Sequence, residues 1–114
     1  MPAPTVYGQP DADVTFVFFG SLKGVVLEAI RTLETEGIHA YGIHFAYVFP
    51  MVEETVKRIL GKGKQLICVE QNATGQLASL IREETGIDIK EQWHKYDGRE
   101  WTVEELVART KGLK

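Results

Sequence analysis

Two short polar segments hold the residues whose types and spacing could support chemistry. The first is Gly20–Gly24, which reads GSLKG and follows an apolar run. A helix that begins here offers free backbone amides and a partial positive charge, and Lys23 adds a full one. Gly20 and Gly24 allow close approach to the backbone, and Ser21 can donate a hydrogen bond. The segment suits an anion, but it matches neither common phosphate-binding glycine motif, and a tight turn capped by Ser21 is the alternative.

The second segment, Glu70–Gln76, reads EQNATGQ and also follows an apolar run. Glu70 ends that run, where a charge is costly unless it is paired or lies at the rim of the protein. Three polar side chains follow within one short connection, those of Asn72, Thr74 and Gln76. One interpretation is a capped helix with Gly75 in its first turn, and the other is a polar cluster that faces a partner domain or a ligand. The residues leave both interpretations open.

Other candidate residues show no catalytic or metal-binding pattern. The histidines have no metal-ligand spacing, since they stand at His39, His44 and His94. Cys68 is the only cysteine and lies in an apolar run, so we expect a buried core residue rather than a reactive thiol. Trp93 and Trp101 bracket a turn, and we expect them to be core or interface anchors. The sequence therefore predicts neither a catalytic set nor a metal site.

An alternation of apolar runs and amphipathic stretches must position the two segments. Strands are predicted at 14–19, 39–45, 65–70 and 87–94. Helices are predicted between Ser21 and Gly37, across Val52–Leu60, from about Thr74 to Gly86, and from Thr102, where Glu105 completes a capping box. This order predicts a three-layer α/β/α fold with a mostly parallel sheet, whose carboxyl-terminal edge holds both polar segments.

Composition bounds the class of protein. Residues 1–13 carry three prolines and no periodicity, so we expect a linker or lead-in from a longer chain before one domain at 14–114. The 114 residues are 44% hydrophobic and 25% charged, with a net charge of −3. That balance argues against a nucleic-acid-binding protein and against disorder. No apolar run reaches the ~20 residues that span a bilayer, and the start shows no secretion signal, so we expect a soluble, cytoplasmic protein.

The motifs resemble a known family. Val14–Gly24, VTFVFFGSLKG, is similar to the opening of the C-terminal domain of the α subunit of 2-oxoacid:ferredoxin oxidoreductases. Glu70–Leu77, EQNATGQL, resembles that family's glutamate–asparagine–glycine–glutamine loop. Further support comes from Tyr47–Pro50, Leu80–Gly86 and Lys95–Arg99, so the resemblance covers the chain from about residue 12. The sequence departs from the family pattern at Phe19, Leu22 and Gln71, which puts the polar contacts of the two loops in question but not the fold.

The resemblance implies a five-stranded mixed sheet of the transketolase C-terminal type, with one antiparallel edge strand. It also implies a whole enzyme that converts a 2-oxoacid and coenzyme A to an acyl-CoA and carbon dioxide and reduces ferredoxin. Such an enzyme uses thiamine diphosphate, magnesium and iron–sulfur clusters, with the thiamine between other domains. We therefore expect this chain to bind no cofactor alone and to be inactive alone. From its composition we expect no nucleic-acid partner, and from its lack of a long apolar run no membrane partner.

The expected partners are the thiamine-binding domains of the same α subunit and the β subunit, with ferredoxin reached through the complex. The expected contact surface consists of the two polar segments: Gly20, Ser21, Lys23, Gly24, Glu70, Asn72, Thr74, Gly75 and Gln76. Three alternatives stand beside this one. They are the C-terminal domain of a transketolase or of a 2-oxoacid dehydrogenase β component, a free-standing module that binds a phosphate-bearing ligand at Gly20–Gly24, and a domain that serves only oligomer contact.

Overall fold

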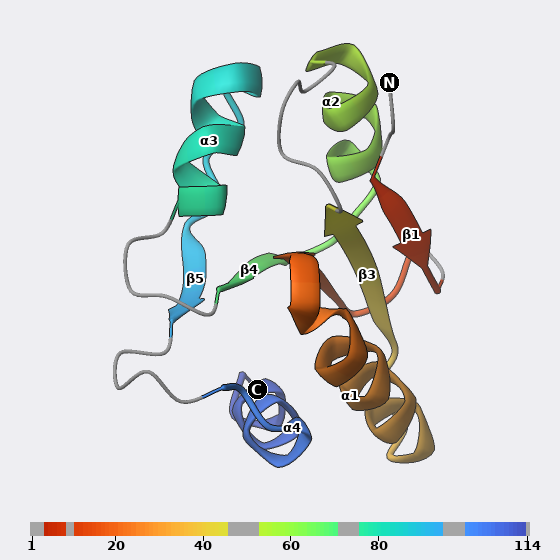
Figure 1. Cartoon of the computed structure of the whole chain (residues 1–114). Coiled ribbons are helices and arrows are strands. Elements are labelled where there is room, and N and C mark those ends of the chain that lie inside the picture. Colours follow the sequence, from red (N-terminus) through yellow and green to blue (C-terminus); the bar gives the residue numbers. More distant parts are fainter. Residues whose placement is uncertain (1–3, 9–10, 46–52, 71–75, 95–99, 114) are drawn as a thin grey trace.

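The apolar runs form a five-stranded sheet with helices on both faces (Figure 1). The structure is a computed structural model that describes residues 4–8, 11–45, 53–70, 76–94 and 100–113. The strands are β1 (Thr5–Tyr7), β2 (Val14–Phe19), β3 (Ala40–Phe45), β4 (Leu66–Glu70) and β5 (Glu91–His94). The helices are the 3₁₀ turn η1 (Gly20–Leu22) and α1 (Lys23–Thr35), α2 (Glu53–Gly61), α3 (Gln76–Thr85) and α4 (Val103–Lys111). Within these residues no helix combines the length and apolar character needed to span a bilayer.

The sheet order is β1-β3-β2-β4-β5. β2 pairs in parallel with both β3 and β4, and β4 pairs in parallel with β5. β1 pairs antiparallel with β3 and forms one edge of the sheet. The prediction of a three-layer α/β fold with a mixed five-stranded sheet and one antiparallel edge strand is therefore confirmed.

Two strand predictions need correction. Thr5–Tyr7 belongs to the sheet, although residues 1–13 were expected to be only a linker. A strand of three residues is too short to show an alternating pattern, and its pairing with β3 comes from residues far along the chain. At the other edge, β5 begins at Glu91, so the predicted strand at 87–94 was too long. Its apolar start has another explanation, because Ile89 is buried in the core without belonging to a strand.

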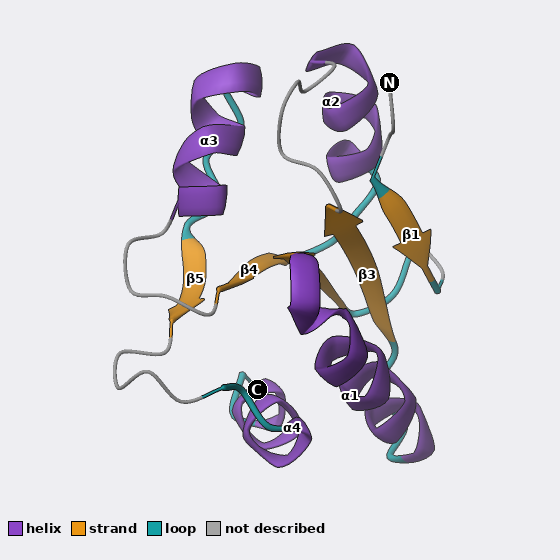
Figure 2. Ribbon diagram, viewed as in Figure 1, coloured by secondary structure: helices purple, strands orange, loops and turns teal. Residues whose placement is uncertain are grey.

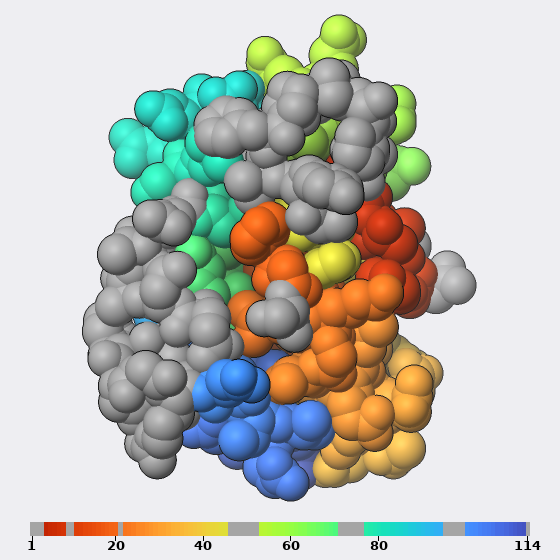
Figure 3. Space-filling model, in the orientation of Figure 1, coloured from red at the N-terminus to blue at the C-terminus, as the bar shows by residue number. Residues whose placement is uncertain are grey.

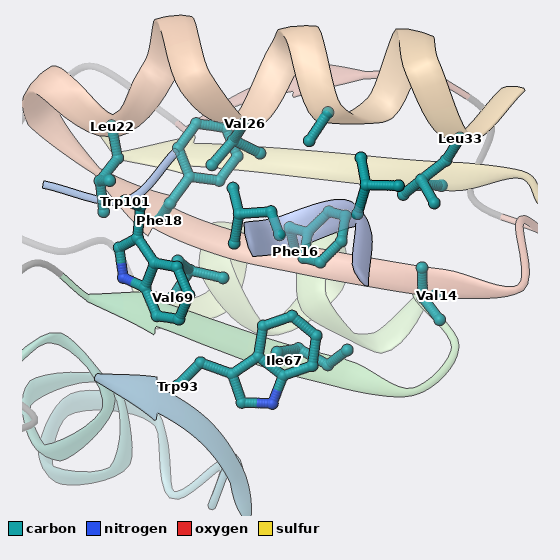
Figure 4. Packing of buried hydrophobic residues seen from close by; sticks show 14 residues of the cluster. Val14, Phe16, Phe18, Leu22, Val26, Leu33, Ile67, Val69, Trp93 and Trp101 are labelled. Atoms are coloured by element: carbon teal, nitrogen blue, oxygen red, sulfur yellow. The ribbon is translucent and has the colours of Figure 1, made fainter. Parts of the chain in front are cut away.

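The strands of the sheet centre are apolar on both faces because both faces are covered. Phe16 and Phe18 of β2 pack with α1 and α4, whereas Val17 between them packs with α2 and α3. Figure 2 shows these two helix layers, with α1 beside α4 on one side of the sheet and α2 near α3 on the other. In Figure 4 the rings of Trp93 and Trp101 lie against Ile67 and Val69 in the α1–α4 layer. The expectation that both tryptophans are core anchors is confirmed.

Helix ends follow local sequence signals, with one exception. α1 ends in a Schellman motif, since Gly37 N–H donates to Glu34 O at 3.1 Å and Ile38 N–H donates to Leu33 O at 3.0 Å. The predicted capping box is present, with Glu105 N–H donating to Thr102 Oγ1 at 3.1 Å. These ends confirm the predictions made for Gly37 and Thr102.

The exception is the start of α1. Ser21 was expected to cap this helix, but Ser21 lies inside η1 and the N-cap residue is Leu22, which has no side-chain cap hydrogen bond. The physical reason is the extra 3₁₀ turn, in which Lys23 N–H donates to Gly20 O. The N-cap position of α1 therefore falls on Leu22 and not on Ser21.

Candidate functional site

The carboxyl ends of the parallel strands meet at one edge of the sheet. β2 ends opposite the end of β3, with Phe19 paired to Phe45, and β4 ends opposite the end of β5, with Glu70 paired to His94. Both predicted polar segments leave the sheet at this edge (Figure 1). The prediction that they share one edge is therefore confirmed, and we call this region the carboxyl edge.

Gly20 makes the turn out of β2. Its φ is +67°, a conformation that favours glycine, yet an added Cβ would meet no atom within 4 Å. The Gly20 carbonyl accepts from Lys23 N–H and lies 3.0 Å from His44 Nε2. Because a carbonyl can only accept, Nε2 carries the proton of that hydrogen bond. Gly24 also has open space at its Cβ, so neither glycine is forced by crowding.

His44 is a neighbour of this segment that sequence reasoning missed. The residue is 8% exposed, the centre of its ring lies 5.2 Å from the centre of the Phe18 ring, and its Nε2 bonds to the Gly20 carbonyl. The contact follows from the parallel register that places His44 beside Phe18. Register between two strands is the signal that could have revealed it, and spacing along the chain cannot supply it. Among the described residues, no group of three His, Cys, Asp or Glu side chains could hold a metal ion.

Phe19 and Lys23 give the carboxyl edge an apolar and a charged side chain. Phe19 is 43% exposed, whereas the three residues before it in β2 are fully buried. The Lys23 ammonium lies 5.9 Å from the centre of the Tyr7 ring, within reach of a cation–π contact. Figure 3 shows the surface here, where the orange atoms of the segment after β2 and the yellow atoms at the end of β3 come out side by side. Phe19 is a second residue that the sequence did not single out as a candidate.

Glu70 is buried, and its carboxylate accepts hydrogen bonds from backbone amides. Its carboxylate accepts from Leu77 N–H at 3.0 Å and from Ala78 N–H at 3.4 Å, so it holds the first turn of α3. A carboxylate is favoured there by the free amides and by the helix dipole. For Glu70 the structure favours helix capping over an outward contact.

Cys68 lies beneath this carboxylate and is buried, as predicted. Its thiol donates to Glu70 Oε2 across 3.7 Å. Burial raises the pKa of the Cys68 thiol well above its ordinary value, and the negative charge of Glu70 raises it further. Little thiolate forms at neutral pH, so the thiol is a poor nucleophile.

The remaining predicted site residues are only partly described. Asn72, Thr74 and Gly75 lie outside the described residues. Ser21 and Gln76 are placed by their backbone in η1 and at the first residue of α3. The structure thus places the first residues of both segments, Gly20 and Glu70, at the carboxyl edge.

Two tryptophans lie below the carboxyl edge, and one of them bonds to Glu70. The Trp101 indole N–H donates to the Glu70 carbonyl at 2.9 Å, and the Trp93 indole N–H donates to Glu91 Oε2 at 2.7 Å. The Arg109 guanidinium covers both rings, 4.9 Å from the centre of Trp93 and 6.0 Å from that of Trp101. These contacts hold β4, β5 and α4 together below the carboxyl edge.

This sheet order, with two helix layers and polar segments at the strand ends, defines an α/β/α sandwich domain. The chain belongs to the family described as the transketolase C-terminal domain, whose model matches residues 5–99. The match begins at β1, inside the segment that was expected to be a lead-in.

Comparison with curated proteins links the chain to one class of subunit. It is 34% identical over 103 residues to subunit α of 2-oxoacid:ferredoxin oxidoreductase 1 from Aeropyrum pernix, covering 89% of this chain and 16% of that protein. The chain therefore spans about a sixth of the length of the curated relatives that it matches.

Comparison with solved structures points to the same class of protein. A 2-oxoglutarate:ferredoxin oxidoreductase from Magnetococcus marinus, solved with 2-oxoglutarate, coenzyme A and succinyl-CoA bound, matches at 30% identity with a TM-score of 0.87, covering 98% of this chain and 20% of that one. The α chain of a probable 2-oxoacid ferredoxin oxidoreductase from Thermoplasma acidophilum is 39% identical with a TM-score of 0.69, covering 97% of this chain and 96% of that one. A transketolase from Pichia stipitis, at 20% identity and a TM-score of 0.71 over 96% of this chain and 18% of that one, shares the fold alone.

Proposed function

We propose that this chain is the C-terminal domain of the α subunit of a thiamine-diphosphate-dependent 2-oxoacid:ferredoxin oxidoreductase, and that it serves assembly rather than chemistry. The whole enzyme would oxidatively decarboxylate a 2-oxoacid to an acyl-CoA and reduce ferredoxin in the cytoplasm. The observation that carries the proposal is the match over 98% of this chain to a 2-oxoglutarate:ferredoxin oxidoreductase. Transketolases, by contrast, resemble it only in fold.

The described residues support a non-catalytic role. Among them no three His, Cys, Asp or Glu side chains lie together, so they supply no all-protein cage for a metal ion. Two buried titratable groups at the carboxyl edge have structural roles or are unreactive. Glu70 caps α3, and the raised pKa of Cys68 keeps its thiol protonated. Thiamine diphosphate supplies the electron sink of such reactions, and we assign it, magnesium and the iron–sulfur clusters to the other domains of the complex.

The carboxyl edge is the surface that we assign to the partner domains. The exposed aromatic ring of Phe19 is typical of an interface anchor, and Lys23, four residues later, adds a cation that could steer a partner. Gly20, Ser21, Gly24, Asn72, Thr74, Gly75 and Gln76 extend the same proposed surface. Glu70 supports this surface from inside, because only 5% of it is exposed. The proposed partners are the thiamine-binding domains of the α subunit and the β subunit. The carboxyl edge would lie beside the path by which substrate or coenzyme A reaches them.

The decisive experiment is capture of the thiamine-binding domains of the same complex by the purified chain. We expect tight capture, and we expect turnover only in the assembled complex. Alanine at Asn72 and Gln76 should weaken both assembly and turnover, and if both stayed unchanged this surface assignment would be abandoned. A thermal shift with coenzyme A or a nucleotide alone, without capture, would instead support an independent ligand-binding module. The electron acceptor used by the complex would separate a ferredoxin-linked enzyme from another thiamine enzyme.

A matched pair of lysine variants makes the test specific. Lys23→Ala removes a cation at the carboxyl edge, and Lys90→Ala removes one just before β5, at the opposite edge of the sheet. We expect Lys23→Ala to weaken capture several-fold and Lys90→Ala to leave it unchanged, as for interface and non-interface charges. Equal effects of the two substitutions would show that capture depends on overall charge rather than on this edge.

A further inference from the structure

Glu70 touches the described ends of two separate segments of the chain. Residues 71–75 leave β4 at Glu70 and rejoin described structure at α3. Residues 95–99 leave β5 at His94 and rejoin described structure one residue before Trp101. The first of these four ends is Glu70 itself, and each of the other three is at or next to a residue that contacts Glu70.

Each of the other three ends contacts Glu70 differently. Where α3 begins, the amides of Leu77 and Ala78 donate to the carboxylate at 3.0 and 3.4 Å. Where β5 ends, His94 is paired with Glu70 across the sheet. After residues 95–99, the Trp101 indole N–H donates to the Glu70 carbonyl at 2.9 Å. One residue therefore uses its side chain for one segment and its backbone for the other.

These contacts are costly to break separately. Glu70 is 5% exposed and Trp101 is also 5% exposed, so water has little access to replace a lost hydrogen bond. A charged acceptor at a helix start binds amides more strongly than a neutral one does. Cys68, buried beneath the carboxylate, donates to it as well and restricts its movement. Moving the first turn of α3 should therefore displace Glu70, and with it the partner of Trp101.

We propose that Glu70 is a positioning residue that couples the first turn of α3 to Trp101 at the start of α4, so that the two shift together. The coupling depends only on contacts within this chain. Its functional consequence rests on the proposed function: the starts of α3 and α4 would respond together to a partner domain at the carboxyl edge. A contact that shifts one helix start would then shift the other.

Amide hydrogen exchange in the 114-residue chain tests the coupling without any partner. Trp101→Phe keeps an aromatic ring but removes the indole donor, and it should speed exchange at the Leu77 and Ala78 amides about fivefold. Glu70→Ala should speed exchange at residues 100–105 by about the same factor. Glu70→Gln keeps the size of the side chain and one acceptor oxygen, so it should give a smaller change at both places. Amides of β2 report global unfolding and set the baseline.

Thr85→Val is the matched control. Thr85 is buried at the other end of α3, where its hydroxyl donates to Ile81 O at 2.6 Å and accepts from Ile87 N–H at 3.2 Å. This variant should loosen that end of α3 and leave Leu77 and residues 100–105 at the baseline. If Glu70→Gln and Trp101→Phe each acted only on their own side, or if Thr85→Val acted on both segments, the proposal would be overturned. Failure of capture with coupling intact would instead count against the proposed function.

Discussion

The two ends of the parallel strands, the carboxyl edge and the opposite end, which we call the amino-terminal edge, differ in how tightly they are packed. At the amino-terminal edge, a Cβ added to Gly63 would lie 2.7 Å from Thr15 Oγ1 and 3.0 Å from its methyl carbon. Next to it, Gln65 has a φ of +44°, and buried Thr15 Oγ1 finds no hydrogen-bond partner among the described residues. At the carboxyl edge, Gly20 and Gly24 have open space at their Cβ positions, and buried Glu70 has its hydrogen bonds.

This difference separates two reasons for an unusual residue. At the amino-terminal edge the atoms are crowded, and a buried hydroxyl has no partner among the described residues, which reflects the demands of close packing. The carboxyl edge holds its polar groups in place and leaves room beside them, which is what a contact surface requires. Substitutions at the two edges should therefore fail for different reasons and by different amounts.

The largest effect should come from Gly63→Ala at the crowded edge. The new methyl group would press on Thr15, so we expect the free energy of unfolding to fall by about 2–3 kcal/mol in urea denaturation. Gly61→Ala is the control, because a Cβ at Gly61 meets no atom within 4 Å. Adding Thr15→Ala to Gly63→Ala should recover part of the loss. Equal losses for Gly61→Ala and Gly63→Ala would break the comparison.

The next effect is pH dependence from Cys68, below the carboxyl edge. Its pKa is raised in the folded chain, so its contribution to stability is complete below the unfolded value near 9 and is lost as pH rises above it. Between pH 7 and pH 10 the chain should lose about 1.4 kcal/mol more than Cys68→Ala does, measured by urea denaturation at both values. Tyr41, whose pKa burial also raises, is present in both proteins and cancels in the difference. Parallel pH profiles would show that the thiol is already solvated in the folded chain.

A smaller effect is expected for Gly20→Ala at the open edge. No atom opposes the new methyl group, so only the left-handed backbone conformation is penalised, by about 1 kcal/mol in the free energy of unfolding. Thermal and urea unfolding would both register this loss. A loss as large as that of Gly63→Ala would mean that the carboxyl edge is as crowded as the amino-terminal one.

The smallest effect should be a gain, from Thr15→Val. The substitution keeps the shape of the side chain and removes a buried hydroxyl that has no partner among the described residues. We expect the free energy of unfolding to rise by up to about 1 kcal/mol. A loss of stability instead would reveal a hydrogen bond to Thr15 Oγ1 and would remove one of the signs of strain at this edge.

Sequence reasoning succeeded where the cause is local. The Thr102–Glu105 capping box and the Gly37 terminator depend on residues three to five apart, and both are present. The strand at Val14–Phe19 was predicted because a run buried on both faces is visible in residue types alone. The fold class followed from the alternation of such runs.

It failed where the cause is a contact between distant residues. β1 depends on pairing with β3, more than thirty residues away, and its three residues carry no pattern of their own. The His44 contact with Gly20 needs the β2–β3 register, and the exposure of Phe19 depends on what packs beyond the end of β2. For Glu70 the sequence predicted that a charge at the end of an apolar strand needs a partner. It did not predict the partners, which are backbone amides seven and eight residues further on.

The tryptophan cluster gives the chain a built-in optical probe. Its two tryptophans, Trp93 and Trp101, have ring centres 6.5 Å apart and share the Arg109 guanidinium. Their emission and near-ultraviolet dichroism will therefore report on one place, the junction of β4, β5 and α4, and will say little about β1 and β3. A label-free fluorescence change on mixing with a partner would then locate the event at the Glu70 side of the carboxyl edge.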